Sequence, residues 1–110
     1  MPESIVSESQ GHRQKRYRTK VAVWACAYEY YNESFVHDTV FDTTCRLVNP
    51  MIPTDKPELD KWFRKYFDHS TGMWVRKHPE LNRLRAICES IIKYHRKSLL
   101  HDVQSGTKPI

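Results

Sequence analysis

Glycine is scarce in this chain: three occur in 110 residues, and Gly11, Gly72 and Gly106 are far apart. A phosphate-binding loop needs several glycines close together, because its backbone must approach the phosphates without side chains in the way. The Gly-x-Ser-x-Gly segment that forms the nucleophile elbow of many hydrolases is also missing. These absences argue against the commonest nucleotide-hydrolysing and ester-hydrolysing enzymes, and we do not expect the chain to be an enzyme.

Cysteine and histidine show no pattern typical of a metal site or a disulfide framework. The three cysteines, Cys26, Cys45 and Cys88, are an odd, widely spaced set among apolar residues. The histidines are scattered, with no Cys-x-x-Cys or His-x-x-x-His pair to hold zinc. We therefore predict free cysteines and no bound metal.

Long apolar runs are absent as well. No stretch of eighteen apolar residues occurs, so the sequence predicts no membrane helix. Residues 1–14 are polar and lack the apolar centre of a secretory signal. We expect a cytoplasmic protein without a membrane partner.

What is present suits one folded domain. Hydrophobic residues make up 39% of the chain, too many for a disordered protein, and the length allows one modest core. We expect a single helical domain over residues 16–100. A flexible basic tail over residues 1–15 and a second flexible tail over residues 101–110 would flank it.

Apolar spacing predicts four helices. The first begins near Arg16 and ends at Asn32–Ser34, because large apolar residues recur every three or four positions. A strand over Val21–Trp24 remains an alternative there. The second begins near Asp38, a suitable N-cap, and stops before Pro50.

The third helix should begin around Asp55, Pro57 and Glu58, which have capping-box spacing, and should end with Gly72 in a left-handed conformation. One apolar stripe runs along it, formed by Leu59, Trp62, Phe63, Tyr66 and Phe67. We expect this stripe to be core, packed against Trp24, Tyr28, Phe41 and Cys45.

The segment Met73–Val75 is apolar and could be extended. The last helix should start at Pro79 and run to about Leu100. The predicted fold class is all-α, a small four-helix domain.

The net charge is +5, and the basic residues fall into two clusters. Such clusters can lie along nucleic-acid phosphates, although solvated helix faces explain them equally well. The candidate nucleic-acid-binding residues are Arg13, Lys15, Arg16, Arg18, Lys20, Arg76 and Lys77.

The corner between the first two helices, residues 28–47, is the most distinctive stretch. It brings paired tyrosines, a phenylalanine and two carboxylates to one helix–turn–helix joint. Aromatic faces and carboxylates suit a flat, partly cationic ligand, whereas a well-capped structural joint would need similar residues. The candidate ligand-binding residues are Tyr30, Tyr31, Asp38, Phe41 and Asp42.

This corner resembles the small N-terminal domain, called Ia, of NAD-dependent DNA ligases. In that family a Tyr-x-Tyr-Tyr signature is followed by a loop and an Asp-x-x-Tyr-Asp segment. Here Tyr28-Glu29-Tyr30-Tyr31 and Asp38-Thr39-Val40-Phe41-Asp42 correspond, with Phe41 in place of the tyrosine. The resemblance implies recognition of nicotinamide mononucleotide (NMN), the nicotinamide half of NAD. The chain has no Lys-x-Asp-Gly adenylation motif, so the resemblance does not extend to ligation.

A second resemblance covers residues 59–63 and 70–81, which look like small phage and prophage proteins described as ligase-related. Three hypotheses for the function follow. The first is a non-catalytic module that binds NMN or NAD. The second is a phage-type regulator of a host protein, and the third is a basic nucleic-acid-binding accessory protein.

Overall fold

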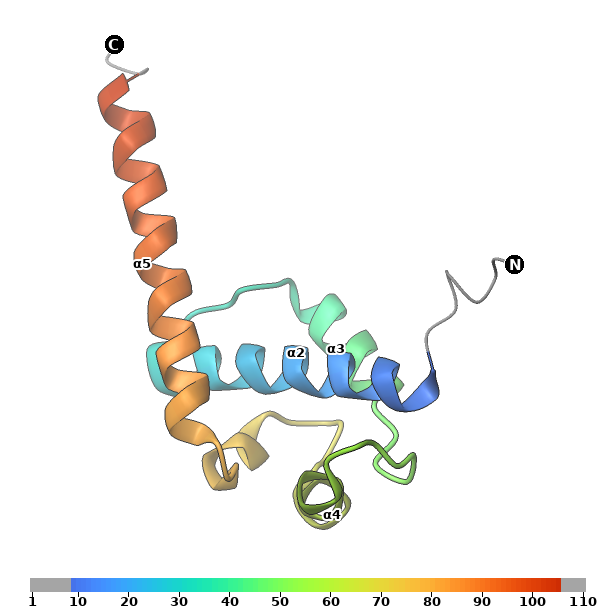
Figure 1. Ribbon diagram of the computed structural model, residues 1–110. Helices are drawn as coiled ribbons and strands as arrows, with labels where there is room; N and C mark the ends of the chain where they lie inside the picture. The colour runs from blue at the N-terminus through green and yellow to red at the C-terminus, as the bar shows by residue number, and fades with distance from the viewer. Residues whose placement is uncertain (1–8, 106–110) are drawn as a thin grey trace.

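Residues 9–105 form four α-helices and one short 3₁₀ helix (Figure 1). The computed structural model describes the backbone of residues 9–105 and the side chains of residues 9–96. Within this range there is no β-strand, so the predicted all-α fold class is confirmed. The elements are α2 (Gln10–Tyr31), α3 (Asp38–Leu47), α4 (Pro57–Tyr66), η1 (Met73–Lys77) and α5 (Leu81–Ser105). No helix in residues 9–105 combines the length and apolar character needed to cross a membrane.

Helix α2 lies at the centre of the fold and contacts α3, α5 and η1. Its buried face carries small residues, among them Ala22, Ala25 and Cys26, each at most 1% exposed. Short side chains let neighbouring helices approach closely. In Figure 1, α5 crosses the C-terminal end of α2 and then continues away from the other helices.

Both ends of the predicted domain differ from the expected boundaries. Helix α2 begins at Gln10, because the Ser9 hydroxyl caps it by accepting a hydrogen bond from the His12 backbone N–H at 3.1 Å. Residues 10–15 are therefore helical and do not belong to a tail. Helix α5 runs to Ser105, beyond the predicted end near residue 100. The remainder of the two predicted tails, residues 1–8 and 106–110, lies outside the described residues.

Neither of the two predicted helix caps forms. His37, not Asp38, is the N-cap of α3, and its Nδ1 accepts from the Thr39 backbone N–H at 3.2 Å. Lys56 precedes α4 without a side-chain cap, while the predicted capping residue Asp55 pairs with Lys15 at 2.9 Å.

The connection between α4 and α5 also differs from the prediction. Gly72 has φ −103°, which is not left-handed. The segment after it is not extended, because Met73–Lys77 form η1. Helix α5 starts at Leu81, after a turn that contains Pro79.

The aromatic stripe of α4 packs on rings that the sequence did not assign to it. Phe63 is 1% exposed, which confirms it as core, and Trp62 and Phe67 are partly buried. Their ring partners are Trp74, centred 5.0–6.1 Å away, and His78. The expectation that Tyr28 belongs to this core is wrong, since that residue is 62% exposed.

Candidate functional site

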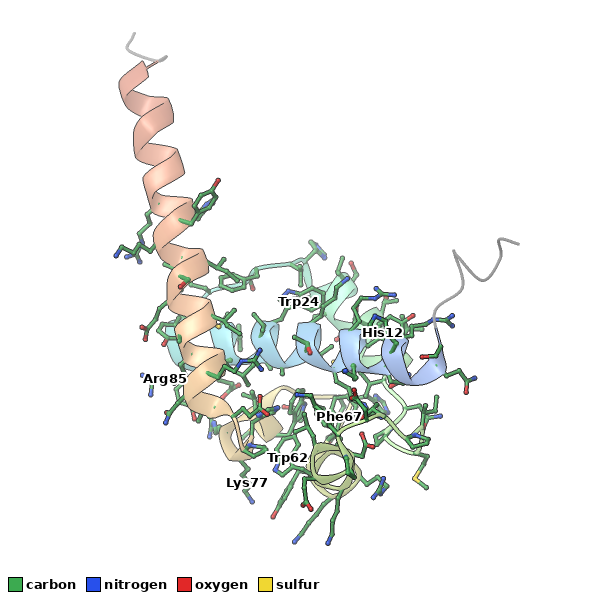
Figure 2. All side chains as sticks on the ribbon, in the orientation of Figure 1. His12, Trp24, Trp62, Phe67, Lys77 and Arg85 are labelled. Atoms are coloured by element: carbon green, nitrogen blue, oxygen red, sulfur yellow. The ribbon has the colours of Figure 1, made fainter. Side chains whose placement is uncertain are left out.

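A cavity of about 410 Å³ opens between the C-terminal half of α2, the segment 33–36, the first turns of α3, and Thr71–Gly72. Figure 2 shows Trp24 on the side of α2 that faces the segment leading into α3. We call this cavity the corner pocket. Its lining includes four aromatic side chains, Trp24, Tyr28, Phe35 and Phe41, and three acidic ones, Glu29, Glu33 and Asp38.

The end of α2 creates the space for this pocket. Asn32 adopts a left-handed conformation with φ 54°, and its backbone N–H donates to the Ala27 carbonyl. The Glu33 N–H donates to the same carbonyl at 3.1 Å. This cap turns the chain back along α2, since a left-handed residue reverses the direction of a helix end. Segment 33–36 therefore becomes one wall of the pocket.

Gly72 keeps the other side of the pocket open. A Cβ at this position would lie 3.1 Å from the Ala25 Cβ and 3.6 Å from the Phe41 ring. The close approach of Ala25 and Phe41 explains why a residue without a side chain fits here, even though the backbone conformation does not demand glycine.

The charge in the corner pocket is negative. Glu29, Glu33 and Asp38 line it, and no lysine or arginine occurs among its described lining residues. The Glu29 side chain is 11% exposed and pairs with Arg76, whose Nη2 lies 2.6 Å from Glu29 Oε1. Aromatic faces and carboxylates together attract a flat cation.

Two of the five ligand-binding candidates, Asp38 and Phe41, line the corner pocket. The other three, Tyr30, Tyr31 and Asp42, are not among its lining residues. Asp42 is exposed on α3. The five candidates therefore do not all line one cavity in the structure.

The two tyrosines face α5 instead. The Arg85 guanidinium carbon lies 5.2 Å from the Tyr30 ring centroid and 5.9 Å from that of Tyr31. The Tyr31 hydroxyl donates to Glu89 at 2.5 Å. Burial and this carboxylate raise the pKa of Tyr31. These contacts hold α5 against the end of α2.

Sequence reasoning left five of the seven aromatic and acidic lining residues out of the candidate set, namely Trp24, Tyr28, Glu29, Glu33 and Phe35. Trp24 was assigned to the core because it follows the helical period of α2. The one available signal was the placement of Glu29 and Glu33 on either side of the tyrosine pair. The positions of Glu29 and Glu33 indicate a shared pocket only when it is known that the chain reverses direction at Asn32.

Several nucleic-acid-binding candidates have partners inside the protein. Arg18 is 4% exposed and forms an ion pair with Asp60. Lys15 pairs with Asp55, Arg76 with Glu29, and the Lys77 Nζ lies 5.2 Å from the centre of the Tyr66 ring. Arg13, Arg16 and Lys20 are exposed on α2.

The two basic clusters approach each other at one cavity, where Lys15 and Arg18 of α2 and Arg83 of α5 all contribute to the lining. Figure 2 shows His12 near the start of α2, away from Lys77, which is the last residue of η1.

Nucleophile and metal chemistry find little support among residues 9–96. Cys26, Cys45 and Cys88 are free and buried. Burial raises the pKa of Cys45 to about 11 and that of Cys88 to about 12, so both stay protonated at neutral pH. No group of three histidine, cysteine or acidic residues within the described part of the chain is arranged to hold a metal ion.

Comparisons with protein families, curated proteins and solved structures found no match to this chain. The resemblance to the ligase Ia domain and to the phage proteins accordingly stays a prediction.

Proposed function

We propose that this protein is a non-catalytic binding module whose corner pocket takes a flat, cationic aromatic ligand of the NMN or NAD class. The observation that carries the proposal is the composition of the pocket: four aromatic rings and three carboxylates, with no cationic side chain in the described lining. The resemblance of the same corner to the ligase Ia domain supports the choice of ligand class.

The chemistry of the pocket suits a pyridinium ring. Phe41 and Trp24 offer aromatic faces to a positively charged ring. Asp38 and Glu33 offer carboxylates that can offset its charge or accept hydrogen bonds from ribose hydroxyls. The cavity volume of about 410 Å³ falls within the range of small-molecule sites.

Titration calorimetry with NMN tests the proposal. Asp38→Asn should weaken NMN binding about three- to tenfold, because one charge that offsets the pyridinium is lost. Asp42→Asn is the matched control: it removes the same charge from the same helix, at a residue outside the pocket lining. We expect the control variant to bind like the unmodified protein. Absence of binding heat at millimolar NMN, with the protein folded by circular dichroism, would refute the proposal.

A further inference from the structure

A second cavity, of about 380 Å³, adjoins the corner pocket. The two cavities share four lining residues, Trp24, Glu33, Ser34 and Phe35. The second cavity is completed by residues of α5, Ile91, Ile92, His95 and Arg96. One surface, made by segment 33–35 and Trp24, therefore borders both cavities.

The two cavities differ in charge. The corner pocket has carboxylates and no cationic residue among its described lining, whereas the second cavity has Arg96 and His95 at its α5 side. Glu33 borders both. Within residues 9–96, neither Arg96 nor His95 has an ion-pair or hydrogen-bond partner, in contrast to Arg83 and Arg85 earlier on the same helix.

We infer that the two cavities form one groove for a zwitterionic ligand, with a cationic ring in the corner pocket and an anionic group beside Arg96 and His95. This inference rests on the proposed function and specifies the other end of its ligand. The groove has negative charge at one end and positive charge at the other, and a ligand with the opposite arrangement is complementary to both.

Arg96 and His95 are solvent-exposed members of a lining that also contains the apolar side chains Ile91, Ile92, Phe35 and Trp24. An exposed guanidinium attracts a phosphate in competition with water and salt, so the expected contact is modest and weakens as salt is raised. Arginine can also bind two phosphate oxygens at once.

A pair of ligands isolates the contribution of the anionic group. NMN and nicotinamide riboside share the cationic ring and the ribose, and only NMN carries a phosphate. Calorimetry should show that the unmodified protein binds NMN more tightly than the riboside. Arg96→Gln should weaken NMN binding about three- to tenfold and leave the riboside affinity unchanged.

Arg83→Gln is the matched control, because it removes one positive charge from the same helix at a residue outside both cavities. The control variant should change the affinities for NMN and for the riboside only by the small amount that the change in net charge causes. In the unmodified protein, the preference for NMN over the riboside should fall as salt is raised, because salt screens the attraction between Arg96 and the phosphate.

The outcomes separate the two claims. If the riboside binds but Arg96→Gln does not reduce the NMN preference, the inference is refuted and the proposed function stands. Equal losses for both ligands in Arg96→Gln also refute the anion site. If neither ligand binds the unmodified protein, the proposed function fails and the inference fails with it.

Discussion

Arg18 Nη1 lies 2.6 Å from Asp60 Oδ1, and both side chains are buried between α2 and α4. Arg18 Nη2 also donates to the carbonyls of Asn49 at 3.0 Å and Ile52 at 2.8 Å. Burial alone would raise the pKa of Asp60, but hydrogen bonds from Thr54 and the Arg18 charge outweigh it and lower that pKa. A residue that the sequence assigned to nucleic-acid contact thus fixes the connector between α3 and α4.

Arg18→Ala should destabilise the protein by roughly 3–5 kcal/mol, because it leaves the Asp60 carboxylate buried without its partner. Lys15→Ala should cost much less, since the Lys15–Asp55 pair is exposed to solvent. Urea denaturation measures both free energies of unfolding. Equal losses for the two variants would contradict the structural role of Arg18.

His78 should make the protein less stable in mild acid. Burial lowers the pKa of His78 from 6.5 to about 4, so the unfolded chain binds a proton between these pH values and the folded protein does not. The free energy of unfolding should therefore fall by up to about 3 kcal/mol as the pH drops from 6.5 to 4. The effect of Asp60 should appear in a separate window below its ordinary pKa of 3.8.

Urea denaturation across this pH range checks the contribution of His78. His78→Asn should flatten the slope, because asparagine does not titrate but can still accept the Glu80 N–H bond that His78 Nδ1 accepts at 2.9 Å. An unaltered slope in His78→Asn would show that other groups cause the acid sensitivity.

Arg76→Ala distinguishes two functions in one variant. The substitution removes the Arg76 guanidinium, so the Glu29 carboxylate that lines the corner pocket loses its ion-pair partner. NMN binding should then strengthen about two- to fivefold, because the pocket becomes more negative. A nucleic-acid-binding role for Arg76 predicts instead a loss of affinity in a low-salt gel shift. Weaker NMN binding in this variant would argue against the charge account of the pocket.

Tyr31→Phe should lower stability and spare ligand binding. The variant loses the hydroxyl that donates to Glu89, and we expect a cost of about 0.5–1.5 kcal/mol. Tyr31 does not line the corner pocket, so the NMN affinity measured by calorimetry should not change. A large loss of NMN affinity with little change in the free energy of unfolding would show that Tyr31 contributes to the binding site.

The sequence was informative where local rules govern structure. The helical period identified the four helices, and Phe63 was correctly assigned to the core. Local rules were insufficient where distant segments meet. That Arg18 would lie against Asp60, forty-two positions away, depends on how the connector folds over α2. The spacing of residue types along the chain does not predict the path of this connector.

The corner pocket shows the same division. Asp38 and Phe41 line it, and both lie at the start of α3, a helix that the sequence predicts. The tyrosines turn toward α5, since Arg85 and Glu89 provide their contacts. Thr71 and Gly72 complete the lining of the pocket. They belong to the connection between α4 and η1, and the helical periodicity of the sequence does not predict that this connection reaches the pocket.

The most direct test of the corner pocket is a titration of ¹⁵N-labelled protein with NMN, followed through the indole N–H signals of the three tryptophans. Trp24 lines the pocket, whereas Trp62 packs against Trp74 and His78 in the aromatic core and serves as an internal control. We predict a saturable shift of the Trp24 signal while the Trp62 signal stays in place. A Trp24 signal that does not move at millimolar NMN would contradict the account.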